Sequence, residues 1–109
     1  MDSKNTVYIE DILENIKNLE TFLHNATKED FFSDLEKQFA IARALEIIGE
    51  ASAKLSEDFR SEHPEIDWRG LKSMRNLLIH EYAYVDVEEI WKACQTDIPE
   101  LKTKLATLK

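Results

Sequence analysis

Residues 39–55 read FAIARALEIIGEASAKL, and the pattern of this stretch is typical of a helix in the core of a helical bundle. Its apolar side chains recur at steps of three and four, the spacing of one face of an α-helix. The set is Phe39, Ile41, Ala42, Leu45, Ile48, Ala51 and Leu55. Gly49 and the alanines project little or no side chain, so we expect a neighbouring helix to pack closely here.

The segments before this stretch continue the helical pattern. Apolar residues at helical spacing predict a helix over about residues 5–24, with an acidic outer face. Residues 27–30 and 33–36 both resemble capping boxes, so the start of the second helix stays open between them. Residues 60–64 are expected to form a connection, because Pro64 disfavours a helical conformation at the residue before it.

A third helix is expected after this connection, with Asp67 as its N-cap and its end near residues 80–84. Its predicted buried stripe consists of Trp68, Leu71, Met74, Leu77 and Leu78.

The start of the fourth helix carries the strongest local signal in the chain. Asp86 leads a variant of the capping box, and Val85 with Ile90 fits a hydrophobic staple. Pro99 cannot donate a backbone hydrogen bond, so we expect a kink there, or a restart with Asp97 as the cap. The chain as a whole is predicted to be all-α: an antiparallel bundle of four to five helices in one domain, residues 1–109.

Composition agrees with a small cytoplasmic protein. The chain of 109 residues is 43% hydrophobic and contains only two Gly and two Pro, which suits a helical core. No signal-peptide pattern opens the sequence, and no stretch approaches the ~18 apolar residues of a membrane helix. The single cysteine, Cys94, cannot form an internal disulfide and lies at a core-facing step, so we expect a small buried side chain.

Several kinds of catalytic site are disfavoured by the sequence. It has no Glu-x-x-His pair, no second cysteine and no glycine-rich phosphate loop, so neither a metal nor a cofactor is expected. His24 and His63 lie at a helix end and in a connection, next to polar residues. Both are expected to be surface histidines without a catalytic role.

One segment combines chemically active side chains. Arg75, Asn76, His80 and Tyr82 place a fixed cation, an amide, an imidazole and a phenol within eight residues. A structural interpretation is available: His80 could cap the helix C-terminus, where a cation is favoured, Tyr82 could pack at the rim, and Arg75 could be solvated. The residue types alone leave both interpretations open.

Residues 74–82, followed by Val85 and Asp86, resemble the Arg-x4-His-x-Tyr signature of HepT toxins in the HEPN superfamily. Four other parts of the chain are also similar to recurrent stretches of this family: residues 48–51, residues 68–69, Trp91 and residues 97–99. The resemblance covers nearly the whole chain.

This resemblance implies a dimeric HEPN bundle that cleaves RNA without a metal, with Arg75 and His80 catalytic and Asn76 and Tyr82 supporting them. It also implies a toxin neutralised by an antitoxin with a nucleotidyltransferase fold, which adds AMP to Tyr82. The chain itself has no nucleotidyltransferase motif, so a partner would perform that reaction.

The chemistry of RNA cleavage suits these residue types. The RNA 2′-hydroxyl is the nucleophile, so the protein needs to move protons and stabilise charge. His80 titrates near neutral pH, and Arg75 offers a planar fork of donors to a phosphate. Asn76 could orient the ring or the phosphate, and Tyr82 could donate a hydrogen bond or stack near a base.

Helix geometry and charge constrain this site. Arg75 and His80 differ in direction by about 140° on a regular helix. They converge only through the reach of the arginine, a helix distortion or a second copy, and a two-fold axis would supply both an acid and a base. The net charge of −8 disfavours general RNA binding, so Arg69 and Lys72 are expected to help form a local basic site.

Two other functions remain possible. A non-catalytic module of the same fold could bind RNA, a nucleotide or a protein partner, and an acidic surface favours this class. A purely structural helical protein would need neither Arg75 nor His80.

Overall fold

The computed structural model describes residues 2–80 and 86–108, apart from the side chain of His80. Its elements are α1 (Ser3–Phe22), α2 (Lys28–Ser33), α3 (Leu35–Lys54), α4 (Glu57–Glu62), α5 (Trp68–His80), α6 (Val87–Lys92), the π-helical turn η2 (Ala93–Asp97) and α7 (Ile98–Ala106). The described residues contain no strand, which confirms the predicted all-α, HEPN-like bundle. None of the described helices is long and apolar enough to cross a membrane.

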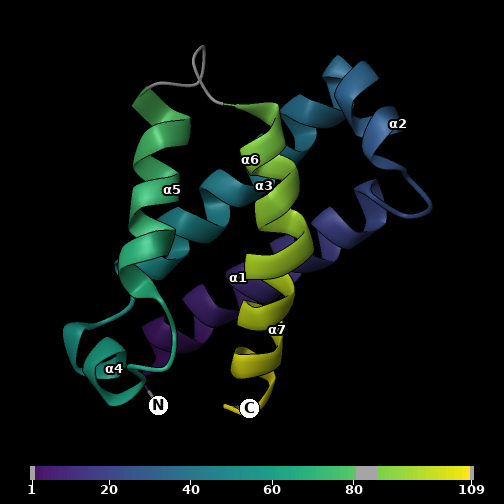
Figure 1. Cartoon of the computed structure of the whole chain (residues 1–109). Coiled ribbons are helices and arrows are strands. Elements are labelled where there is room, and N and C mark those ends of the chain that lie inside the picture. The colour runs from purple at the N-terminus through teal and green to yellow at the C-terminus, as the bar shows by residue number, and fades with distance from the viewer. Residues whose placement is uncertain (1, 81–85, 109) are drawn as a thin grey trace.

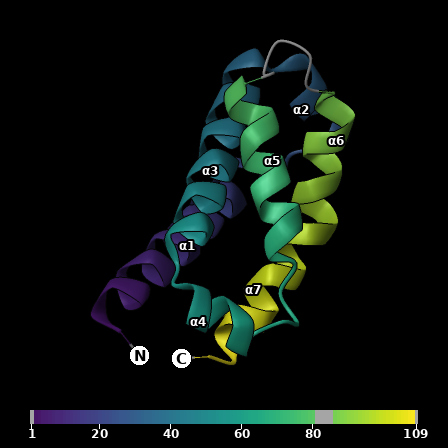
Figure 2. The same cartoon turned by 90° about the vertical axis from the view of Figure 1, so that its left-hand side faces the viewer.

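The long helices form two layers (Figures 1 and 2). One layer holds α1 and α3, and the other holds α5 and the continuous α6–η2–α7 segment. Helix α3 packs against both α1 and α5, which makes it the centre of the bundle. The stretch that predicts the fold is therefore also the helix that supports α5.

The first helix begins earlier than predicted, because the Asp2 side chain accepts a hydrogen bond from the Lys4 backbone N–H at 2.8 Å. It also ends earlier, at Phe22. Its predicted apolar face is largely buried. The fully or nearly fully buried members are Ile9, Ile12, Ile16 and Leu19.

Both candidate start signals before residue 39 begin helices. Thr27 and Asp30 form a complete capping box at α2. Helix α3 then begins with Asp34 as its N-cap, whose side chain accepts from the Lys37 N–H at 3.0 Å, and Ser33 closes α2 instead. The sequence left open whether the second helix starts at residues 27–30 or at residues 33–36. In the structure, one helix starts at each place.

The predicted connection over residues 60–64 is wrong in its first part. Helix α4 includes Arg60–Glu62, because Ser56 caps it by accepting from the Phe59 N–H at 3.1 Å. Asn5 of α1 holds this cap in place: its amide donates to the Ser56 hydroxyl at 3.1 Å and accepts from the Ser56 N–H at 3.0 Å.

Helix α5 begins where the sequence predicts, and the Asp67 carboxylate accepts from the Gly70 N–H at 2.9 Å. Leu71 and Leu78 are buried, and Trp68 and Met74 are half-buried. Leu77 is an exception to the predicted stripe, with 39% of its surface exposed, because its register turns it away from α3.

The Asp86 cap is confirmed, since its carboxylate accepts from the Glu88 N–H at 2.8 Å. Val85 lies outside the described residues, so the predicted staple is not described. Asp97 makes no side-chain cap, and the chain passes from α6 to α7 through the π-helical turn η2. Pro99 has no backbone N–H and so cannot donate a hydrogen bond to the carbonyl one turn before it. The wider π-helical turn η2 accommodates this missing hydrogen bond, and the chain continues into α7 without a new helix start.

Candidate functional site

Helix α5 is a locally positive element of a predominantly acidic protein. Its sequence contains Arg69, Lys72 and Arg75 and no acidic residue, whereas the whole chain has a net charge of −8. Arg69 and Lys72 are exposed, and in the described part of the chain neither has an ion-pair partner. These side chains form a local basic surface of the kind that RNA binding requires on an acidic protein.

Arg75 is fixed by the contact between α3 and α5. A Cβ at Gly49 would lie 2.5 Å from the Arg75 Cβ and 3.2 Å from the Leu71 carbonyl oxygen, so only glycine permits this approach. The predicted close packing at Gly49 is therefore present, and its partner is the helix with the candidate site. The guanidinium Nε of Arg75 is buried and has no hydrogen-bond partner among the described residues.

The remaining predicted residues follow along α5. Asn76 is exposed and lies one turn after Lys72. His80 is the last residue of α5, and the register places position 80 one turn after Asn76. Tyr82 lies outside the described residues. The basic residues, Asn76 and position 80 thus share one helix.

The geometry of α5 limits how Arg75 and His80 can meet. The helix is an uninterrupted α-helix from Trp68 to His80, so the described segment contains no distortion that would bring the two positions together. Their separation of about 140° remains. This leaves the reach of the arginine or a second copy of the chain as the route to a shared site.

Two apolar side chains next to these polar residues were not recognised from the sequence. Ile79 is 38% exposed and Leu77 is 39% exposed. Ile79 adjoins the basic surface, whereas Leu77 lies on the flank toward α6 and α7. The helical register could have identified Ile79 as exposed, because it lies two turns after the exposed Lys72, whereas it does not separate Leu77 from the buried stripe.

The cysteine and the other two histidines of the chain lie outside the candidate site. Cys94 is buried as predicted, and its burial raises the pKa of the thiol to about 12. His24 is exposed. His63 is half-buried, 3.3 Å from a carboxylate oxygen of Glu65. Among the residues that the structure describes, no three potential ligands cluster in a way that could hold a metal ion.

Comparison with known proteins places the chain among ribonucleases. Residues 12–108 match the family described as "Ribonuclease HepT-like". A "Probable ribonuclease HepT" from Thermococcus cleftensis is 50% identical over 102 residues, which cover 94% of this chain and 93% of the relative.

Two more distant relatives carry the description "Putative RNase". One, from Methanocaldococcus jannaschii, is 38% identical over 84% of this chain and 76% of its own length. The other, from Caldanaerobacter subterraneus, is 38% identical over 90% of this chain and 88% of its own length. No solved structure matches the chain at a significant level.

Proposed function

We propose that this chain, which belongs to the HepT-like family of ribonucleases, cleaves RNA with Arg75 and His80 as its catalytic residues. One observation carries the proposal: the only long helix of the described chain that has cations and no carboxylate also contains both residues. Arg69 and Lys72 bind the RNA backbone on the same helix.

The reaction needs two proton transfers and stabilisation of one charge. The RNA 2′-oxygen attacks the adjacent phosphorus, its proton passes to a base, and the 5′-oxygen of the next nucleotide leaves with a proton from an acid. The products are a 2′,3′-cyclic phosphate and a 5′-hydroxyl. His80 exchanges these protons, and Arg75 stabilises the charge that develops on the phosphate oxygens. Asn76 and Tyr82 orient the reacting groups.

A homodimer completes the site. A single histidine cannot be base and acid at the same moment, and one regular helix cannot turn both Arg75 and His80 toward one phosphate. Two copies related by a two-fold axis beside α5 would supply two of each residue. The exposed Ile79 next to the basic surface supports an interface at this position.

Regulation by a partner belongs to the same proposal. An antitoxin with a nucleotidyltransferase fold would transfer AMP from ATP to the Tyr82 hydroxyl and release pyrophosphate. The attached phosphodiester would occupy the cationic surface of α5 and exclude the RNA backbone. Family resemblance supports this step, and Tyr82 follows His80 by two residues in the chain.

A cleavage assay with matched variants tests the catalytic assignment. His80→Ala and Arg75→Ala should each lower the rate of RNA cleavage by at least about 100-fold while the thermal unfolding temperature changes little. His24→Ala and Lys54→Ala remove an exposed histidine and an exposed cation away from α5, and they should cleave like the parent protein. Full activity of either α5 variant would refute the proposal.

The chemistry of the products separates this function from its alternatives. We expect cleavage to continue in the presence of a strong chelator and to leave cyclic-phosphate or 3′-phosphate ends. A requirement for an added divalent metal would contradict the mechanism. Purified protein, freed of any partner, that binds RNA without cleaving it would support the non-catalytic binding module.

The tyrosine step has its own test. Mass spectrometry of the chain co-expressed with a neighbouring nucleotidyltransferase should show added AMP at Tyr82, and Tyr82→Phe should remove that adduct. Tyr84→Phe is the matched control because it removes a nearby tyrosine hydroxyl. An adduct that persists in Tyr82→Phe would show that another residue is modified.

A further inference from the structure

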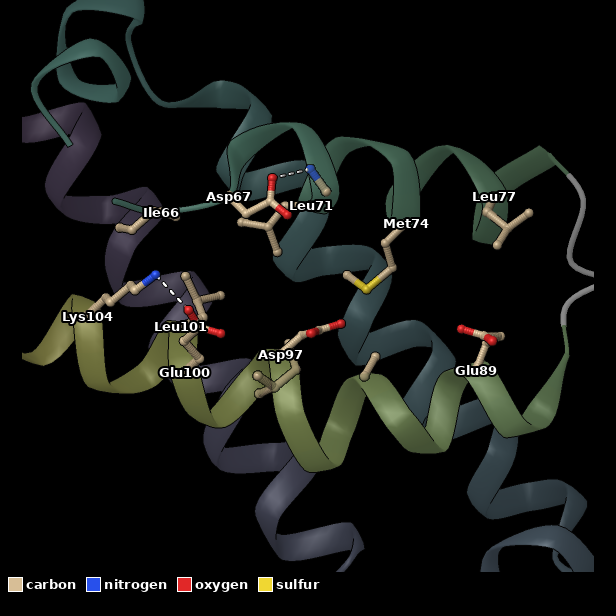
Figure 3. Close-up of a pocket in the computed structure, with 13 residues that line it drawn as sticks. Ile66, Asp67, Leu71, Met74, Leu77, Glu89, Asp97, Glu100, Leu101 and Lys104 are labelled. Carbon is tan, nitrogen blue, oxygen red and sulfur yellow. Dashed lines mark hydrogen bonds and ion pairs between the residues drawn. The ribbon is translucent and has the colours of Figure 1, made fainter. Parts of the chain in front are cut away.

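A groove separates α5 from the α6–η2–α7 segment on the flank away from Arg75 (Figure 3). Its volume is about 270 Å³. Side chains from both sides form an apolar floor: Leu71, Met74 and Leu77 of α5 face Ala93, Ile98 and Leu101 of the other segment. Leu77 is 39% exposed here, so the floor has apolar surface that no described part of the chain covers.

The rim of the groove is acidic. Asp67, Glu89, Asp97 and Glu100 line it, and Lys104 is the only cation among the residues that form it. Lys104 is already engaged, since its ammonium group lies 2.8 Å from a carboxylate oxygen of Glu100. Glu89 and Asp97 are exposed and have no ion-pair partner in the described chain. The groove therefore presents negative charge around an apolar floor.

The shape favours a helix over a small molecule. The volume lies near the lower limit of the roughly 300–1,000 Å³ of typical small-ligand sites, so the length of the groove is the more informative feature. The wall that α5 and its cap Asp67 form extends over residues 67–77, or about 15 Å, which is the length of nearly three helical turns. A groove of this kind can accept a row of apolar side chains from one face of a helix.

We propose that this groove binds an amphipathic, positively charged helix of a partner protein. Apolar side chains of the partner contact the exposed Leu77 and the half-buried Met74, and lysines or arginines at the edges of its apolar face pair with Glu89 and Asp97. A second copy related by a two-fold axis at this groove fits poorly, because it would bring its own acidic rim against this one.

The proposed surface is distinct from the RNA site. Asp67 and positions 70, 71, 74 and 77 of α5 line the groove, whereas Arg69, Lys72 and Asn76 are exposed on the other side of the helix. A partner helix in the groove therefore contacts α5 without covering its cations. The inference does not depend on ribonuclease activity, and a binding experiment tests it separately.

The probe is a synthetic, amphipathic helical peptide of about 15 residues, with leucines on one face and lysines beside them. A control peptide carries glutamates in place of the lysines. Fluorescence anisotropy measures the affinity, and amide chemical shifts of the labelled protein map the site. We expect the lysine peptide alone to bind, with shifts concentrated at Leu71, Met74, Ala93 and Leu101.

Matched variants test the contribution of charge. Glu89→Gln and Asp97→Asn should each weaken binding by about 1.5- to fivefold, and the double variant by more, since exposed ion pairs contribute modestly. Glu29→Gln removes a first-turn glutamate from α2, and Asp11→Asn removes an exposed aspartate from α1. Both should bind like the parent protein, and thermal unfolding should show that all five variants are folded.

Three results would overturn the proposal. Equal affinity for the glutamate peptide would exclude charge recognition, and shifts confined to another face would place the site elsewhere. The third is self-association of the unliganded protein that Leu77→Glu abolishes, which would assign the groove to a second copy of the chain.

Discussion

Replacing Gly49 by alanine tests whether the contact between α3 and α5 positions Arg75. The new Cβ would lie 2.5 Å from the Arg75 Cβ and 3.3 Å from the Arg75 Cα. Carbon atoms pack favourably at about 3.5–4.0 Å, so α5 must move away from α3 by at least about 1 Å at this point. The residue that moves is the candidate catalytic arginine.

The effects on stability and on activity should differ in size. Strain from overpacking costs about 1–3 kcal/mol, whereas alanine stabilises a helix interior by about 1 kcal/mol relative to glycine. The free energy of unfolding should therefore fall by about 0–2 kcal/mol, which lowers Tm by at most about 10 °C. A displacement of about 1 Å can lower a catalytic rate by about 100-fold.

The assay compares RNA cleavage and thermal unfolding of Gly49→Ala with those of Ala40→Gly. Ala40 lies nine residues earlier, on the opposite side of α3, and its replacement costs about 1 kcal/mol without touching α5. We expect Gly49→Ala to lose far more activity than Ala40→Gly at a temperature where both are folded. Equal activity in the two variants would refute the positioning argument.

Three further predictions concern stability and reactivity. Asn5→Ala removes both hydrogen bonds to Ser56 and should lower the free energy of unfolding, measured by chemical denaturation, by about 1–3 kcal/mol. If the losses of stability in Asn5→Ala and Ser56→Ala simply add in the double variant, the two residues do not stabilise the protein through a shared contact. Burial raises the pKa of the Cys94 thiol to about 12, so a thiol reagent at pH 8 should label Cys94 only after unfolding. Hydrogen bonds from Thr27 lower the pKa of Asp30 below its ordinary 3.8, so its contribution to stability is present above about pH 4 and lost as the pH falls through the lowered value. The stability difference between the parent protein and Asp30→Asn should shrink over that acidic range, and a difference that grows would contradict the capping role.

The sequence predicted best the features that depend on near neighbours in the chain. A cap needs only an acceptor side chain and the next turn, and Asp67 and Asp86 both cap as predicted. The connection predicted at residues 60–62 was wrong because the short helix α4 is capped locally by Ser56 and is also held by hydrogen bonds from Asn5, which is 51 residues away in the chain. Periodicity predicted the buried face of α5 but wrongly included Leu77. An apolar residue at the border of the buried face has the same spacing in the sequence as one inside it.

The candidate site was predictable to the level of the helix that carries it. Spacing placed Arg75 and His80 on one helix, and the absence of carboxylates from residues 68–80 is visible in the sequence. The role of Gly49 as the contact of Arg75 depends on the distance between two helices, which no local pattern specifies. The acidic groove also depends on the packing of two segments, because its walls come from α5 and from the α6–η2–α7 segment, which residues 81–85 separate in the chain.

The charge distribution also allows the dimer to be tested without any cleavage. At physiological ionic strength, charges more than about 8 Å apart are largely screened, so the cations of α5 act locally despite the net charge of −8. For single-stranded RNA, the logarithm of affinity falls with the logarithm of salt concentration by about 0.7 per neutralised phosphate. Arg69, Lys72 and Arg75 of one copy would give a slope of about −2, and two copies at one site about −4. His80→Ala binds RNA without cleaving it in our proposal, so its affinity can be measured across salt concentrations. A slope near −4 that falls to about −2.8 in the additional variant Lys72→Ala supports the shared site, whereas a slope near −2 assigns RNA binding to a single copy.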